Sequence, residues 1–151
     1  MPDGTTPESG PGIAEVQAEL IEDFQYFDDW MDRYRYIIDL GKKLPAFPED
    51  WMVDTYKVEG CQSQVWLVPE AMGELIRFHA ISDAAIVSGL IAILLRVYSD
   101  RRPEDILATP PEFIAGIGLD EHLSPSRTNG LHSMIKTMFA HARVQQAGLA
   151  G

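Results

Sequence analysis

The chain has 151 residues, of which 46% are hydrophobic, and its 12 basic and 23 acidic residues give a formal net charge of −11. This length suits a single domain with a proper core, and the negative charge argues against proteins that bind nucleic acid or anionic membranes through a basic surface. The longest apolar run, Gly89 to Leu95, is too short to span a bilayer, and without a secretion signal the expected location is the cytoplasm.

The first part of the chain predicts a tail followed by two helices. Residues 1–12 are rich in Pro, Gly, Ser and Thr and are interpreted as a disordered N-terminal tail, while residues 13–151 are expected to form one domain. Apolar residues recur at three- and four-residue spacing from Ile13 to Phe27, which is typical of an amphipathic helix. Asp29 is suited to cap a second helix, which is expected to end with Gly41 in the left-handed conformation.

The middle of the chain predicts an antiparallel β-hairpin. The run Gln64–Val68 is β-branched and aromatic and is interpreted as a strand. The sequence PEAMG at 69–73 is interpreted as a turn, and the alternating run ELIRFHAIS at 74–82 as the second strand.

A third helix is predicted at about Ala84–Tyr98, with Ser82 or Asp83 as its cap. This segment is apolar on nearly every side, so the helix is expected to lie centrally in the core. Together with the hairpin and the flanking helices, it indicates an α+β fold with a small antiparallel sheet and helices packed on one of its faces.

The C-terminal third predicts two short helices and one long helix. Pro103 and Pro110 are suited to the first turns of the short helices, and Gly118 to the end of the second. The long helix follows "SPSR", and its predicted apolar face consists of Leu131, Met134, Ile135, Met138 and Phe139.

The single cysteine, Cys61, is the residue most suited to chemistry. One cysteine excludes an internal disulfide and a cysteine-built zinc or iron–sulfur site within one chain. Gly60 allows a tight turn before the thiol, and the next residues, Gln62, Ser63 and Gln64, can form hydrogen bonds around it. These neighbours favour a loop that presents the thiol at its tip over a structural core cysteine.

Three kinds of chemistry could use this thiol. A cysteine hydrolase needs a histidine base and usually a nucleophile at the start of a helix, whereas Cys61 leads into a strand. A metal site would need histidines at ligand spacing on one face, which the chain lacks. A persulfide carrier needs one thiol and no second cysteine that could close a disulfide and release the sulfur. The histidines available to the first two chemistries are His79, His122, His132 and His141.

The sequence GCQSQVW at 60–66 resembles the active loop of the SufE family, sulfur acceptors that assist cysteine desulfurases in iron–sulfur cluster assembly. Three further segments resemble the family in the same order and at the same spacing. These are YIIDLGKKLP at 36–45, SDAAIVSGLIAIL at 82–94 and HLSPSRTNGL at 122–131.

The resemblance implies that Cys61 accepts sulfur from a SufS-type or CsdA-type desulfurase and passes it to an iron–sulfur scaffold. Pyridoxal phosphate would belong to the desulfurase, and this chain would hold no cofactor or metal. The implied fold is the α+β fold that the SufE family shares with IscU-type scaffolds. In the SufE family the acceptor thiol rests in an apolar cavity at a loop tip and must swing out. Loop and partner contacts are expected from Gly60, Gln62, Ser63, Gln64, Asp83 and Arg127.

One neighbouring charge and one alternative function also bear on the expected role of Cys61. Glu59 places an acidic group near the thiol, where a negative charge would raise its pKa. The alternative to sulfur transfer is an adaptor that shares the fold, docks a desulfurase or scaffold and regulates it without carrying sulfur.

Overall fold

The structure, a computed structural model, describes residues 12–150. The tail predicted for residues 1–12 therefore lies outside the described residues except for Gly12, which directly precedes the first helix. No helix in this described range combines the length and apolar character needed to cross a membrane.

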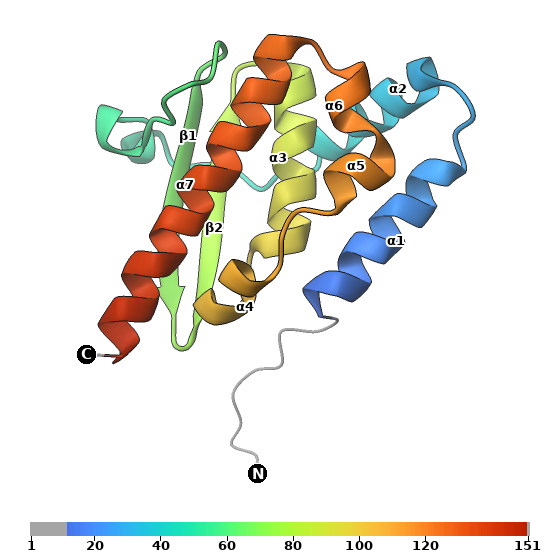
Figure 1. The fold of residues 1–151 in the computed structure, drawn as a ribbon. Coiled ribbons are helices and arrows are strands. Elements are labelled where there is room, and N and C mark those ends of the chain that lie inside the picture. The colour runs from blue at the N-terminus through green and yellow to red at the C-terminus, as the bar shows by residue number, and fades with distance from the viewer. Residues whose placement is uncertain (1–11, 151) are drawn as a thin grey trace.

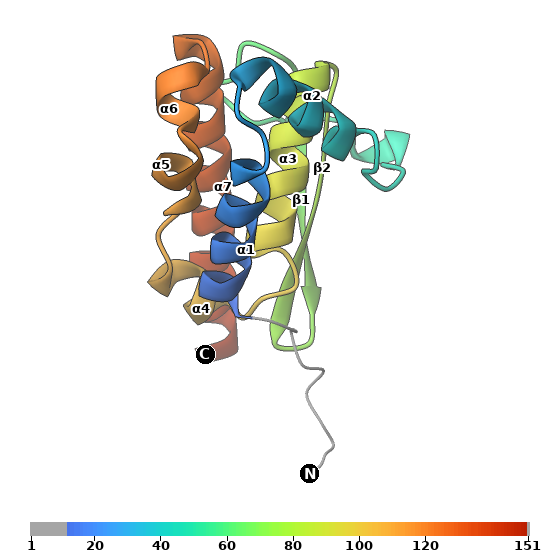
Figure 2. The same ribbon diagram turned by 90° about the vertical axis from the view of Figure 1, so that its right-hand side faces the viewer.

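The architecture is a β-hairpin with helices packed on one face, as the sequence predicted (Figures 1 and 2). The helices α3 and α7 lie against the hairpin, α1 and α2 pack outside α3, and three short helices connect α3 to α7. The elements are α1 (Ile13–Gln25), α2 (Trp30–Gly41), η1 (Glu49–Trp51), η2 (Asp54–Tyr56), β1 (Val65–Met72), β2 (Leu75–Ser82), α3 (Ala85–Tyr98), α4 (Pro103–Ala108), α5 (Phe113–Ile117), α6 (Leu119–His122) and α7 (Pro125–Ala150).

The hairpin is longer than predicted because the sequence PEAMG is not a turn. Its first four residues continue β1, and the chain reverses at Gly73 (φ +62°) and Glu74. Pro69 is tolerated because it pairs with Phe78, whose N–H points away from β1 to Ser99 Oγ at 2.9 Å. At this pair the backbone N–H of residue 69 would also point away from β2, so no hydrogen bond between the strands is lost. This is the kind of edge-strand position in which proline is tolerated.

Two predicted helix ends are confirmed, and a third has a different physical basis. The Asp29 carboxylate accepts the Asp32 N–H at 2.9 Å and caps α2, and Gly118 ends α5 with φ +90°. Gly41 is the last residue of α2, but its φ is not positive, so it is not left-handed as predicted. The C-cap is the following residue, Lys42, in the right-handed conformation. A Cβ at position 41 would lie 2.6 Å from Gly89 N on α3, so glycine is needed there for close helix packing.

The predicted side-chain cap of α3 and the predicted start of α5 are wrong. The N-cap of α3 is Ala84, and no side chain caps the helix, because Asp83 bonds to a neighbouring loop instead. Pro103 does begin α4, but α5 begins at Phe113, three residues after Pro110. The short helix α6 was not predicted.

The core is built around α3, most of whose residues are buried. It contacts β2, α1, α2 and α7, so the prediction of a central helix is confirmed. The predicted apolar face of α7 also lies in the core, with Phe139 partly buried and the other four residues buried.

The close crossing of α2 and α3 makes a prediction about Gly89. A Cβ at this position would collide with the backbone of Ile37 on α2. Gly89→Ala should destabilise the fold by about 1–3 kcal/mol through overpacking, which outweighs the gain of about 1 kcal/mol from removing a helical glycine. Gly148→Ala, in a helix position with open space, should be neutral or stabilising. Urea unfolding followed by circular dichroism would test both, and equal stability of Gly89→Ala and wild type would contradict this account.

Candidate functional site

The thiol lies in a short loop, residues 59–64, that is closed at its base by backbone hydrogen bonds. The Val58 N–H donates to Val65 O at 2.9 Å. Gln64 and Asp83 exchange two bonds, since the Gln64 N–H donates to Asp83 Oδ1 at 3.1 Å and the Asp83 N–H donates to Gln64 O at 3.3 Å. The residues that flank the loop are therefore joined to each other and to Asp83, just before α3, by hydrogen bonds, which hold the two ends of the loop together.

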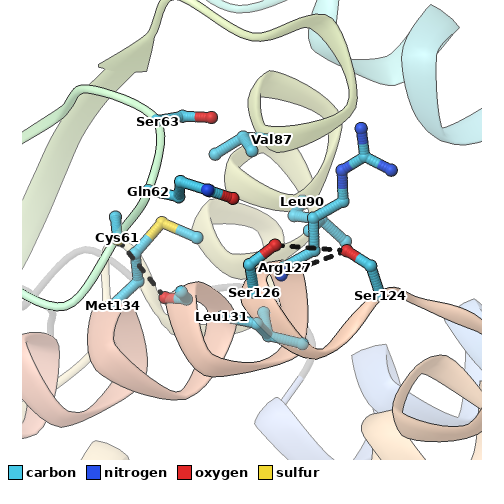
Figure 3. A pocket seen from close by; sticks show the side chains of 11 residues that line it. Cys61, Gln62, Ser63, Val87, Leu90, Ser124, Ser126, Arg127, Leu131 and Met134 are labelled. Carbon is cyan, nitrogen blue, oxygen red and sulfur yellow. Dashed lines mark hydrogen bonds between the residues drawn. The ribbon is translucent and has the colours of Figure 1, made fainter.

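The tip of this loop rests against α7. Gly60 has φ +89°, a conformation that favours glycine, and a Cβ there would meet the side chain of Ser133. The Cys61 thiol donates a weak hydrogen bond to Gly130 O, with the sulfur and oxygen 3.7 Å apart (Figure 3). The loop is thus pinned at its base by several bonds and at its tip by one weak contact.

Cys61 faces a cavity of about 200 Å³ between the loop, α3 and α7 (Figure 3). One part of the wall is apolar and comes from the two helices. The other part is polar and comes from the loop and the start of α7. The apolar residues are Val87, Leu90, Leu131 and Met134, and the polar residues are Gln62, Ser63, Ser124, Ser126 and Arg127.

Partial burial governs the electrostatics of the thiol. Burial raises the pKa of Cys61 above its ordinary value, because the thiolate loses solvation when it leaves water. The expected contribution of Glu59 is not among the causes of this shift. At neutral pH the resting thiol is therefore protonated and weakly nucleophilic.

The start of α7 places a cation beside the cavity. Ser124 caps the helix by accepting the Arg127 N–H on its hydroxyl at 3.4 Å, and Pro125 takes the first helical position. The Arg127 side chain is exposed, and within residues 12–150 its guanidinium makes no ion pair. Its positive charge is thus available to an anion or an acidic partner at the cavity mouth.

The structure separates the predicted site residues into two groups. Gln62, Ser63 and Arg127 line the cavity with Cys61, whereas the other three hold the loop without lining it. Gly60 turns the chain before the thiol, and Gln64 and Asp83 form the base.

Sequence reasoning missed most of the cavity wall. The missed residues Gly130, Leu131 and Met134 lie with the predicted Arg127 at the three- and four-residue spacing of one face of α7. Val87 and Leu90 are spaced in the same way on α3. This spacing was visible in the sequence, but nothing in it showed that the two faces meet around Cys61.

None of the four histidines lines the cavity. His79 bonds to Glu70 at 2.9 Å and His132 to Asp120 at 3.1 Å, while His122 stacks on Trp30 with ring centroids 4.1 Å apart. No group of three or more potential metal ligands occurs within residues 12–150. The arrangement therefore offers no base for a cysteine hydrolase.

The raised pKa predicts slow alkylation of Cys61 by iodoacetamide in the folded protein. The rate should rise with pH to a midpoint above that of the urea-unfolded chain, because only the thiolate reacts. As the pH rises, the thiol of the unfolded chain loses its proton before the thiol of the folded protein does. The free energy of unfolding should therefore decline once the pH exceeds the pKa of the unfolded thiol. Cys61→Ser should not show this decline. A folded midpoint at or below the unfolded one would contradict the proposed burial effect.

The bond between Gln64 and Asp83 predicts that Asp83→Ala loosens the loop. Losing this one solvent-exposed hydrogen bond, worth about 1 kcal/mol, should increase Cys61 alkylation a few-fold without unfolding the protein. Asp54→Ala makes the same charge change at an exposed position outside the loop and serves as the matched control. Equal rates in the two variants would show that the carboxylate does not restrain the loop.

Comparisons with known proteins identify the family of this chain. The SufE family, described as "Fe-S metabolism associated domain", matches residues 18–142. An uncharacterized SufE-like protein of Rhizobium meliloti is 48% identical over 129 residues, which cover 82% of this chain and 92% of the relative. A second one, from Rhizobium etli, is 46% identical over 134 residues, which cover 85% of this chain and 90% of the relative.

The fold also has a solved counterpart. The solution structure of a hypothetical protein from Thermus thermophilus matches with a TM-score of 0.73 at 23% identity, over 87% of this chain and 96% of that one. This likeness supports the fold alone, whereas the sequence matches establish the family. The chain belongs to the SufE family, whose general role is sulfur transfer in iron–sulfur metabolism together with a cysteine desulfurase.

Proposed function

We propose that this protein accepts sulfur on Cys61 from a pyridoxal-phosphate-dependent cysteine desulfurase of the SufS type, activates that desulfurase, and delivers the sulfur to an iron–sulfur scaffold. The observation that carries the proposal is a lone thiol at the tip of a pinned loop, facing a cavity of about 200 Å³. Pyridoxal phosphate stays with the donor, and this chain itself holds no cofactor or metal. The reaction takes place in the cytoplasm, where thiols remain reduced.

The transfer step is a thiol–persulfide exchange. The Cys61 thiolate attacks the outer sulfur of the donor's persulfide, a new S–S bond forms at Cys61, and the donor cysteine leaves as a thiolate. The bond made and the bond broken are of the same kind, so no external oxidant or reductant is needed. The described chain has no second cysteine that could close a disulfide and release the sulfur within the molecule.

The resting structure supports a thiol that reacts only with a docked partner. Burial keeps Cys61 protonated by raising its pKa, and its contact with Gly130 O directs it toward α7 rather than toward solvent. A partner that opens the loop would solvate the sulfur and lower the cost of the thiolate. Arg127 and the hydroxyls of Ser124 and Ser126 border the cavity and can stabilise the negative charge of a persulfide.

Intact-protein mass spectrometry tests the proposal. The protein is mixed with a SufS-type desulfurase, pyridoxal phosphate and L-cysteine in the absence of reductant. We expect a gain of one or more sulfur atoms that maps to Cys61 and is removed by dithiothreitol, together with faster desulfurase turnover.

The variant Cys61→Ser separates carrier from adaptor. It should bind the desulfurase but neither gain sulfur nor stimulate turnover. If Cys61→Ser still stimulates turnover fully, the protein is an adaptor that regulates the desulfurase. If the folded, reduced wild type gains no sulfur from any desulfurase of its own cell, the carrier function is wrong.

A further inference from the structure

A second cavity lies apart from the Cys61 site, in a groove between the end of α2, β2 and the C-terminal half of α3. Its volume is about 630 Å³, within the range of about 300–1,000 Å³ that is usual for ligand sites. The two cavities share no lining residue, although both use α3. The groove is therefore a separate surface that a partner could occupy while the loop is engaged.

The floor of the groove is apolar and partly accessible. Phe78 is buried at its base, and Leu40, Leu44 and Leu95 are each only partly covered by the chain itself. Covering such side chains would remove apolar surface from water, which favours association with apolar groups of another molecule.

The rim carries a charge opposite to that of the whole protein. Among the residues that line the groove, the three cations Lys43, Arg77 and Arg96 outnumber the one carboxylate, Asp100, so the lining has a formal charge of +2 with His79 neutral, whereas the chain carries −11. Two further carboxylates, Glu19 and Asp23, pair with Arg96 from outside the lining. Three of the 12 basic residues are thus gathered around one apolar depression.

These cations can exchange or accept new partners at low cost. Arg77 is paired with Asp100 at 2.7 Å, and Arg96 makes longer contacts with Asp23 at 3.4 Å and with Glu19 at 3.5 Å. These pairs are solvent-exposed, and such pairs contribute little to stability. Lys43 is exposed and makes no ion pair in the part of the chain that the structure describes.

We infer that this groove docks a peptide segment of a partner protein that combines apolar side chains with carboxylates. The apolar floor takes the hydrophobic side chains, and Lys43, Arg77 and Arg96 pair with the acidic ones. A nucleic acid would meet the same cations, but a polyanion without apolar side chains leaves the floor uncovered and is repelled by the remaining surface. The inference is independent of the sulfur chemistry at Cys61.

Chemical-shift mapping of ¹⁵N-labelled protein tests the inference with defined probes. The first probe is an acetylated and amidated tetrapeptide of sequence Asp-Leu-Glu-Phe. We expect saturable shifts at the amides of Lys43, Leu44, Phe78 and Leu95, and weaker binding at higher salt. The control peptide Lys-Leu-Lys-Phe keeps the apolar side chains but reverses the charge. The control peptide Asp-Ser-Glu-Ser keeps the charge but replaces the apolar side chains with serine. Both should bind at least several-fold more weakly than Asp-Leu-Glu-Phe.

Two neighbouring lysines provide a matched pair of variants. Lys43 lines the groove, whereas Lys42 is paired with Asp39 and lies outside it. Lys43→Glu should weaken binding of Asp-Leu-Glu-Phe about five- to tenfold, and Lys42→Glu, with the same charge change, by less than about twofold. Repeating the titration with Cys61→Ser should give unchanged binding, so this test succeeds or fails separately from sulfur transfer.

Three outcomes would overturn the inference. One is the absence of saturable shifts in the groove, with the protein shown to be folded. Another is equal binding of the basic and the acidic peptide. The third is an equal effect of Lys43→Glu and Lys42→Glu, which would show that only overall charge matters.

Discussion

The burial of α3 on nearly all sides is the constraint on which the rest of the structure depends. A helix that is apolar around its circumference must be enclosed, and here α1, α2, α7 and the hairpin enclose it. The glycine pair Gly41 and Gly89 lets α2 approach closely enough to complete this enclosure. Both cavities border α3, which supplies Val87 and Leu90 to one and Ala92, Leu95 and Arg96 to the other.

The site at Cys61 combines a reactive group with conditions that keep it unreactive. Burial raises the pKa of the thiol, and its contact with Gly130 O holds it against α7. The same loop is short, has a left-handed glycine before the thiol, and is fixed mainly at its base. The thiol is therefore partly shielded from solvent in a loop whose tip is held by one weak contact.

The charge distribution is uneven in a way that the net charge conceals. The chain is strongly acidic, yet Arg127 stands beside the thiol cavity and three further cations surround the groove near the end of α2. Local cations on an acidic protein can orient acidic partners, whereas the overall charge suppresses contact with nucleic acids.

The sequence by itself determined most element types, the central helix and the single cysteine on which the proposed function rests, because periodicity, capping and cysteine content are local properties. The sequence analysis placed Pro69 in a turn, but it lies within β1. Proline usually indicates a turn, and it fits a strand only at an edge position where the missing N–H would face outward. The sequence did not show that β1 provides such a position. The local pattern also indicated that Asp83 caps a helix, whereas the family resemblance placed it near the loop, where it contacts Gln64. Only the tertiary structure decided which helix faces enclose Cys61 and that its thiol is partly buried. Both depend on packing between segments about 70 residues apart, such as Cys61 and Gly130.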